Sequence, residues 1–274
     1  MGIDWMHGYS ATWRVCRVDA GTWEPCGELQ GIEAITVERD GSDEAPMLES
    51  ATVTATMPAT ERFEPGWHRV YMDAVQGQYS ESVPIATFWL DSARENWSKG
   101  VRKDELSGSS VLMQAAAAKV GNGSYALNGV DGADLAARML AACIDAPVSV
   151  TGGFELTRNV VFDLGASVLE AAWTVLREGG WIIWINGHGD VEVKPLPDEP
   201  ALVLDREGAA IMMPRVISND DSISYTREWH PGVHPYSVVR GALPEYGLDG
   251  IYRVSTQRLT CGCGIVVEES IEAM

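Results

Sequence analysis

Residues 165–195 constrain the fold more than any other stretch of this chain. Ser167 and Glu170 have the spacing of a capping box, in which hydroxyl and carboxylate each bind a free backbone N–H at a helix start. The apolar residues that follow recur at helical spacing and form one face: Leu169, Ala172, Trp173 and Leu176. A double glycine at 179–180 ends the helix, and the glycine-rich turn at 186–190 (NGHGD) joins strands expected at 180–184 and 191–195. The segment therefore predicts a helix followed by a β-hairpin.

The same segment carries a resemblance to a known family. SVLEAAWTVLREGGW, the strand after it, NGHGD and VEVKPLP resemble the middle segment of the baseplate hub proteins of tailed bacteriophages. In that family a central insertion lies between two tube-forming β-barrels and ends in such a helix and hairpin. The resemblance is one of pattern and layout and includes no catalytic signature. It implies a structural virion protein rather than an enzyme.

Residues 1–100 have the pattern of a β domain. Between residues 51 and 57, apolar side chains alternate strictly with threonines, which is typical of a half-buried strand. Further strands are expected at 12–18, 22–29, 32–39, 67–75 and 83–91. Trp13 and Trp89 follow the strand alternation, so we expect them in the core. Several short strands at this spacing predict a barrel or a sandwich.

The pattern changes after residue 91. Residues 92–108 interrupt the apolar pattern and are expected to form a linker or a polar edge. Helices are predicted at 109–120, which is alanine-rich, and at 131–144. Residues 121–126 match G-x-G-x-x-A but follow a helix instead of a strand, so we assign them to a loop. One face of the second helix is expected to hold Leu135, Met139, Ala142 and Cys143.

Beyond residue 198 the β character returns. Strands are expected at 201–204, 210–213, 222–227, 236–241, 250–258 and 264–268. Residues 247–259 (GLDGIYRVSTQRL) resemble the late strand pair of the second hub barrel. Successive β, α and β runs predict a mainly β fold with an α+β insertion. In this division a first tube-like barrel occupies 1–100, the insertion 101–198 and a second tube-like barrel 199–274.

The chain is strongly acidic, with 39 acidic and 20 basic side chains and a formal net charge of −19. This balance argues against a protein that holds nucleic acid by neutralising its phosphates. Two explanations stay open. The charge can serve solubility, or, as the resemblance implies, an acidic wall can repel DNA that slides through a channel. Which acids would face such a channel is unknown from the sequence.

Five cysteines form an odd and scattered set, which indicates reduced thiols in a protein made in the cytoplasm of the bacterial host. A zinc site from Cys261, Cys263, His230 and His234 is an alternative, because the histidines have zinc-finger spacing. The C-x-C spacing and the separation of about thirty residues favour an ordinary strand instead. We predict no metal and no cofactor.

No catalytic motif stands out in the sequence. Residues 8–12 (GYSAT) lack the last glycine of the G-x-S-x-G elbow, so Ser10 is expected at a strand edge. His7, His68 and His188 stand in unrelated contexts and are expected in turns or in the core. No apolar run reaches the roughly 18 residues that span a bilayer, and the N-terminus lacks the pattern of a secretory signal. We therefore expect neither enzymatic activity nor membrane insertion.

The resemblance implies ring assembly at the virion tail tip. Two barrels in one chain would let a trimer match a sixfold tail tube above and a threefold fibre or spike below. Expected partners are further copies, the distal tail protein with the tail tube ring, the tip fibre or spike, and genomic DNA in passage without specific binding. The N-terminal set Trp5, Met6 and Tyr9 is the predicted subunit interface, and a frayed terminus is the alternative for this segment.

Two alternatives remain beside the hub. The first is the distal tail ring protein, which is normally hexameric. The second is a phage cell-wall hydrolase or carbohydrate-binding module, which requires an aromatic-lined groove and, for hydrolysis, a working carboxylate pair.

Overall fold

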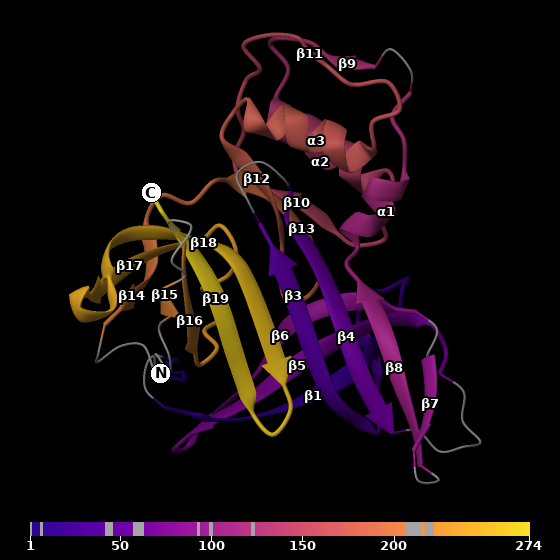
Figure 1. Cartoon of the computed structure of the whole chain (residues 1–274). Coiled ribbons are helices and arrows are strands. Elements are labelled where there is room, and N and C mark those ends of the chain that lie inside the picture. Colours follow the sequence, from indigo (N-terminus) through magenta and orange to yellow (C-terminus); the bar gives the residue numbers. More distant parts are fainter. Residues whose placement is uncertain are drawn as a thin grey trace.

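The computed structural model describes residues 2–5, 8–41, 46–56, 63–91, 94–98, 101–121, 124–205, 215–216 and 222–274. Figure 1 shows an insertion of helices and short strands that stands on a large curved arrangement of strands. The predicted mainly β fold with an α+β insertion is thereby confirmed.

The first strand-rich region runs from β1 to β8. Its strands are β1 (Ser10–Val18), β2 (Pro25–Glu28), β3 (Ile32–Asp40), β4 (Leu48–Thr56), β5 (Gly66–Gln76), β6 (Tyr79–Leu90), β7 (Arg94–Ser98) and β8 (Val101–Ser109). The predicted alternation in β4 is confirmed, because Ala51, Val53 and Ala55 are buried. Met57, the last residue of that pattern, lies outside the described residues.

Within the segment expected to be a linker, the described residues 94–98 and 101–108 form strands instead. β7 pairs with β8, and β8 pairs further with β4 and β6. Of the two expectations, the polar edge fits β7, which within the described part of the chain pairs only with β8. Charged residues enter β8 because Arg102 Nε and Nη2 donate to the two carboxylate oxygens of Asp104 at 2.8 and 2.7 Å. Each buried charge thus neutralises the other, and the first strand-rich region extends to Ser109.

The insertion contains three helices and short strands. They are α1 (Leu112–Ala117), β9 (Tyr125–Ala126), α2 (Gly132–Ala141), β10 (Val148–Val150), β11 (Val160–Val161), α3 (Val168–Arg177), β12 (Trp181–Ile185) and β13 (Val191–Pro195). The predicted helix and hairpin are confirmed. The backbone N–H of Glu170 donates to Ser167 Oγ at 3.1 Å, and that of Ser167 donates to Glu170 Oε2 at 2.7 Å. β12 and β13 pair antiparallel, and β10 joins β13 in parallel.

Two details of the helices differ from the prediction. α1 is shorter than the helix expected at 109–120, because Ser109 pairs with Ser50 in the β8–β4 ladder and Ala118 has an extended backbone. The predicted face of α2 is only partly right: Leu135 and Cys143 are half-buried against apolar clusters, but the fully buried side chains are those of Ala133, Ala136, Ala137 and Leu140. These small residues lie where α2 packs against α3, so the neighbouring helix decides the face. In the described part of the chain, no helix has the length and apolar character needed to cross a membrane.

The second strand-rich region follows the insertion. It contains β14 (Pro200–Leu204), β15 (Arg215–Val216), β16 (Ser222–Arg227), β17 (Val238–Leu243), the 3-10 turn η1 (Pro244–Tyr246), β18 (Leu248–Cys261) and β19 (Ile265–Ala273). The strand expected at 210–213 lies outside the described residues. Of residues 247–259, expected as a strand pair, Gly247 ends the turn η1 and residues 248–259 belong to one long strand, β18.

A single sheet joins the two strand-rich regions. Its order is β15-β16-β19-β18-β3-β4-β8-β6-β5-β1-β2, with β17 and β14 branching from β18 and β7 from β8. β18 pairs antiparallel with β3, and Arg258 lies opposite Glu38. The division of the chain at residues 100 and 198 stays a prediction. The shared sheet shows that the two strand-rich regions, although far apart in sequence, are hydrogen-bonded to each other through β18 and β3.

Two apolar clusters share the strands β18 and β19. The first core includes Val15, Ile35, Val53, Val70, Phe88, Leu259 and Val267. The second core includes Leu204, Tyr225, Val239, Leu248, Val254 and Ile271. A β-bulge between Val254 and Thr256 interrupts β18 where it passes from the second core to the first. Bulges bend a strand and turn its side chains toward new neighbours, which suits a strand that serves two cores.

Candidate functional site

The glycine-rich turn of the insertion hairpin is seated on the first strand-rich region. A Cβ at Gly187 would collide with the carbonyl oxygen of Pro84 in β6. Gly189 has φ +80°, and a Cβ there would lie 2.6 Å from Thr87 Cβ. The glycines therefore serve close backbone contact as well as turn geometry. The local sequence predicts the turn, but it carries no sign of the β6 residues on which the turn packs.

Arg69 in β5 holds this turn in place through hydrogen bonds. Its side chain is buried, and Nη2 donates to the carbonyl oxygens of His188 at 2.7 Å and Trp23 at 3.1 Å. Arg69 Nε donates to Thr87 Oγ1, which in turn donates to the carbonyl of Gly187 at 3.0 Å. Trp23 has φ +60°, and its indole N–H also donates to the His188 carbonyl, at 2.9 Å. We call this arrangement the turn socket; it ties the insertion rigidly to β5 and β6.

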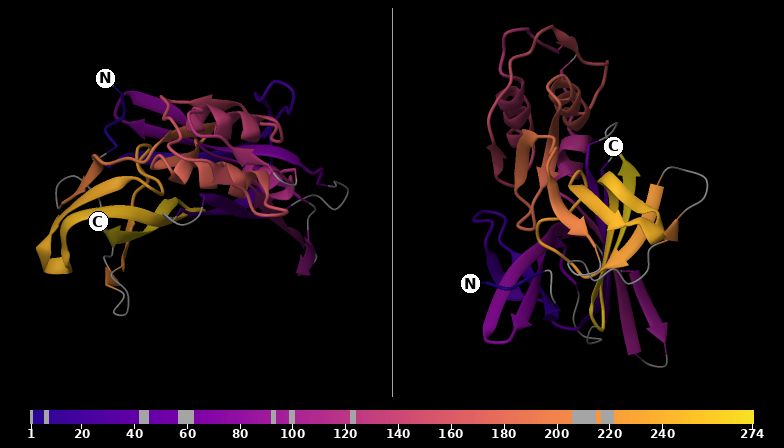
Figure 2. Two further views of the ribbon diagram at one scale, coloured as in Figure 1. Left: turned by 90° about the horizontal axis from the view of Figure 1, so that it is seen from above. Right: turned by 90° about the vertical axis from the view of Figure 1, so that its left-hand side faces the viewer.

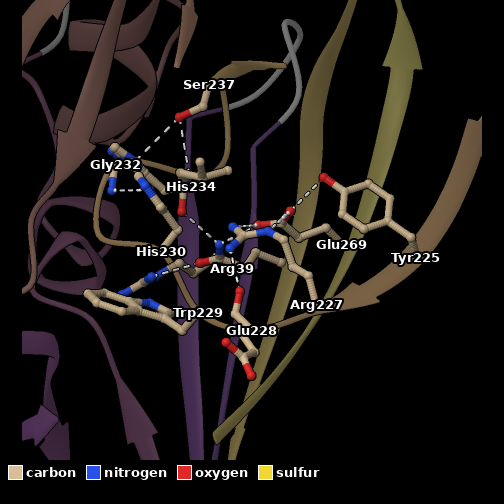
Figure 3. A network of polar contacts seen from close by, with 12 residues as sticks. Arg39, Tyr225, Arg227, Glu228, Trp229, His230, Gly232, His234, Ser237 and Glu269 are labelled. Atoms are coloured by element: carbon tan, nitrogen blue, oxygen red, sulfur yellow. Dashed lines mark hydrogen bonds and ion pairs between the residues drawn. The ribbon is translucent and has the colours of Figure 1, made fainter. Parts of the chain in front are cut away.

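A row of buried polar side chains crosses five adjacent strands where the two cores meet. In strict cross-strand register it runs through Tyr225, Glu269, Gln257, Arg39 and Glu49, on β16, β19, β18, β3 and β4. Figure 3 shows Tyr225, Glu269 and Arg39 of this row. We call these five residues, with Arg227 beside them, the polar row. Because every member is buried, the row separates one apolar core from the other within a continuous sheet.

Glu269 is the centre of the polar row. Its carboxylate accepts two hydrogen bonds from Arg227, at 2.8 and 2.6 Å, one from Tyr225 at 2.7 Å and one from Gln257 at 2.8 Å. Burial by itself would raise the pKa of Glu269, but Arg227, Gln257 and Tyr225 hold that pKa below the ordinary value of 4.5. Glu269 is thus a buried, ionised carboxylate with its acceptors satisfied.

The other end of the polar row is less complete. Arg39 Nη1 donates to Gln257 Oε1 at 2.9 Å, and Nη2 donates to the carbonyl of Ile85. Glu49 lies 3.6 Å from Arg39, and among the described residues its carboxylate oxygens accept no hydrogen bond. Burial raises the pKa of Glu49 above 4.5, against the opposing charge of Arg39. The sequence signal for the whole row was present: polar residues at inward positions of alternating strands.

The zinc alternative brings no cluster together. His230 and His234 lie in the β16–β17 loop, where His234 packs edge-on against Trp184 of the insertion at 3.4 Å between ring centroids. Cys261 is buried at the end of β18, where burial raises the pKa of its thiol to about 12, and Cys263 is exposed. Within the described ranges, no group of three or more His, Cys, Asp or Glu residues is placed to hold a metal.

The predicted interface residues pack on their own chain. Trp5 lies edge-on to Tyr9 at 5.1 Å and to Trp229 at 5.7 Å, and Tyr9 OH donates to the carbonyl of Trp229 at 2.5 Å. Met6 lies outside the described residues. The role of all three at a subunit interface stays a prediction.

Of the two tryptophans expected in the core, one is placed there. Trp13 packs against the first core, and its indole N–H donates to the carbonyl of Gly262 at 3.0 Å. The prediction for Trp89 is wrong, because its side chain is 37% exposed. It lies opposite Trp67 in β5, at 5.4 Å between ring centroids, and Trp67 is buried in the apolar cluster that includes the insertion. Ser10, the near-miss nucleophile, is the exposed first residue of β1.

The outward side of the strands β19, β18, β3, β4 and β8 is a broad polar surface, which we call the open face. Its register rows include Glu268, Arg258, Glu38, Ser50 and Ser109, and beside them Thr260, Thr36, Thr52 and Ser107. Two ion pairs lie on it, Arg258–Glu38 at 3.4 Å and Lys103–Glu33 at 2.7 Å. Exposed Asp40, Glu105 and Glu268 add negative charge, so the acids outnumber these two bases.

Two surface hollows are large enough to be considered as the groove that a hydrolase would need. One, of about 590 Å³, lies over the open face and is lined by Glu38, Asp40 and Met113 among others. The other, of about 680 Å³, lies against α3 and includes Glu170. The capping contacts lower the pKa of Glu170, so it is an ionised structural group and a poor general acid.

Comparison with solved structures shows what the fold is similar to. A tail protein from Neisseria meningitidis MC58 matches with a TM-score of 0.66 and 15% identity, over 96% of this chain and 96% of its own. The 43 kDa tail protein of prophage MuSo2 from Shewanella oneidensis gives 0.66 and 12%, over 97% and 98%. The E. coli c3393 protein, described as a type VI secretion component with structural similarity to T4 tail proteins gp27 and gp5, gives 0.53 and 7%, over 90% and 75%.

No family profile and no curated protein sequence matches the chain. The similarity therefore lies in the arrangement of helices and strands. The sequence identities of 15% and 12% are too low for a comparison of sequences to detect it. It covers nearly the whole length of this chain and of the two tail proteins. The chain has the fold of prophage tail proteins.

Proposed function

We propose that this chain is a structural hub protein of a phage tail tip, which assembles as a ring around a DNA channel. Its support is the tail-protein fold together with one observation, the curved, polar and acidic open face. Figure 2 (left) shows the second strand-rich region and the β7–β8 hairpin at opposite ends of a curved molecule, both turned to the same side. Copies arranged end to end would enclose the open face.

The charge of the open face suits the wall of such a channel. Carboxylates repel DNA phosphates, and at physiological ionic strength this repulsion reaches about 8 Å from the wall. Thr and Ser side chains between the acids keep the surface hydrated and offer no cationic contact that would hold a phosphate. The net charge of −19 acts in the same direction over the whole molecule. DNA would pass such a wall without sticking.

The proposed ring is a trimer. Each chain supplies two strand-rich units, the first running through β8 to Ser109 and the second proposed to begin at residue 199, so three chains present six walls. Such a ring adapts the sixfold tail tube, through the distal tail protein, to a threefold fibre or spike. The virion tail tip is the proposed location, after synthesis in the host cytoplasm.

Electron microscopy of the purified full-length protein tests this function. Class averages viewed down the symmetry axis are expected to show a threefold ring with a central hole. A sixfold ring would favour the distal tail ring protein instead. A monomer that clears bacterial walls in a zymogram would overturn the hub and support the hydrolase.

A further inference from the structure

An apolar stripe crosses the outer side of the second strand-rich region. Val203 in β14 and Ile251 in β18 are 38% and 40% exposed, and each lies opposite Arg240 of the intervening strand β17. Met274, whose backbone N–H donates to the Ile251 carbonyl, is 59% exposed and extends the row. Three large apolar side chains in one register row are more than scattered surface residues.

A single cation interrupts this stripe. Arg240 is exposed between Val203 and Ile251, and no carboxylate within the described ranges pairs with it. An arginine among apolar side chains is typical of the centre of a protein interface, where the guanidinium meets a carboxylate of the partner. A second copy of this chain, with its net charge of −19, offers many carboxylates that could meet Arg240.

The β7–β8 hairpin at the other end of the molecule carries the complementary groups. Trp97 is 60% exposed. Glu95 lies two residues before it and therefore on the same face of β7. The Glu95 carboxylate lies 3.2 Å from Arg102, but Arg102 is already bound through two nitrogens to Asp104. Glu95 thus keeps acceptor capacity for an incoming cation.

We propose that the β7–β8 hairpin of one copy docks on the apolar stripe of the next, with Trp97 against Ile251 and Glu95 against Arg240. The two surfaces lie at opposite ends of the curved molecule (Figures 1 and 2), so the contact is head to tail. A head-to-tail contact closes a ring when its rotation allows it. This inference rests on the proposed ring and names the residues that join its subunits.

The ring gives this contact its strength. Four residues of the stripe and two of the hairpin bury less than the roughly 1,200–2,000 Å² of a stable isolated interface. In a closed ring, however, every subunit is held at both ends, so leaving requires two contacts to break. Trp97 and Arg240 would be the residues that dominate each contact.

Sedimentation of purified full-length protein over a range of concentrations tests the proposal. Trp97→Ser or Ile251→Ser is expected to raise the dissociation constant of the ring at least about 30-fold, the effect of losing a central anchor. Val161→Ser and Leu164→Ser are matched controls at the tip of the insertion, where the side chains are 74% and 83% exposed. They are expected to leave the mass distribution unchanged.

Mixing the two variants tests the head-to-tail geometry. The Trp97→Ser chain keeps an intact stripe and the Ile251→Ser chain keeps an intact hairpin, so one unaltered contact forms between them. Because a single contact lacks the support of a closed ring, the mixture is expected to yield only a weak heterodimer, seen at high protein concentration and formed by neither variant alone. Glu95→Arg and Arg240→Glu should each weaken assembly about tenfold, and the double variant should restore it.

The outcomes separate this inference from the proposed function. A wild-type ring that all four variants leave intact, or a Glu95→Arg/Arg240→Glu double variant that assembles no better than either single variant, overturns the contact and leaves the ring standing. If Leu164→Ser instead lowers the sedimenting mass, the subunit contact lies at the insertion tip, which also overturns the proposed contact. A folded wild type that sediments as a monomer at every concentration overturns both contact and ring.

Discussion

Arg69 and Arg227 are both 2% exposed, yet they are stabilised in different ways. Arg69, in the turn socket, donates to backbone carbonyls and a hydroxyl, all of them neutral. Arg227, in the polar row, holds the Glu269 carboxylate with two hydrogen bonds. The first arrangement depends on the shape of a glycine turn, and the second on the ionisation of one carboxylate. The turn socket should therefore be sensitive to changes in the shape of the glycine turn, and the polar row should be sensitive to pH.

Removing Arg227 is expected to have the largest effect. Arg227→Ala leaves the Glu269 carboxylate buried without a cation, which should lower the free energy of unfolding by about 3–5 kcal/mol. Chemical denaturation at neutral pH measures this change. Arg138→Ala is the control, because Arg138 is 68% exposed in a surface pair with Asp134 and should cost under about 0.5 kcal/mol. Equal losses in both variants would contradict the central place of the polar row.

Removing Arg69 should have a smaller effect. Arg69→Met takes a donor from the His188 and Trp23 carbonyls, at a cost of about 1.5–3 kcal/mol. The loss is expected to be the same at every pH at which the protein folds, because the lost partners carry no charge. Arg258→Met on the open face, with its side chain 55% exposed, serves as the control in the same denaturation series. A loss that varies with pH would break the comparison between the two arginines.

A methyl group in the turn socket tests the close contact directly. Gly187→Ala is expected to lower the free energy of unfolding by about 1–3 kcal/mol, because the new Cβ meets the Pro84 carbonyl. Limited proteolysis should then cut the insertion faster than in the wild type. In Gly27→Ala, a Cβ meets nothing within 4 Å, so neither property should change. Unaltered proteolysis of Gly187→Ala would show that the turn does not hold the insertion.

The smallest expected effect is a pH dependence confined to the polar row. The folded-state pKa of Glu269 is lowered, so its ionised form contributes stability above the unfolded pKa near 4.5, and that contribution is lost as pH falls through the folded pKa. The difference in unfolding free energy between wild type and Glu269→Gln should therefore shrink from about pH 7 to about pH 3. The difference between wild type and Arg69→Met should stay constant. Two parallel differences would contradict the assignment of the charge to Glu269.

Local patterns predicted most of the elements. The capping box of Ser167 and Glu170, the hairpin turn and the alternation in β4 all depend on residues within a few positions of each other, and each is present. The face of α2 and the exposure of Trp89 could not be predicted this way, because a neighbouring element decides which side is covered. Residues 92–108 were misassigned because their charges are neutralised by pairing within the strand.

By itself, the sequence determined the mainly β character, the insertion with its capped helix and hairpin, and the acidic surface, since each follows from short-range spacing or composition. Only the tertiary structure decided that β18 pairs with β3, that two cores share the strands β18 and β19, and that a polar row lies between them. Arg39 and Gln257 are 218 residues apart, and a contact at that separation depends on the packing of the whole chain rather than on any local preference.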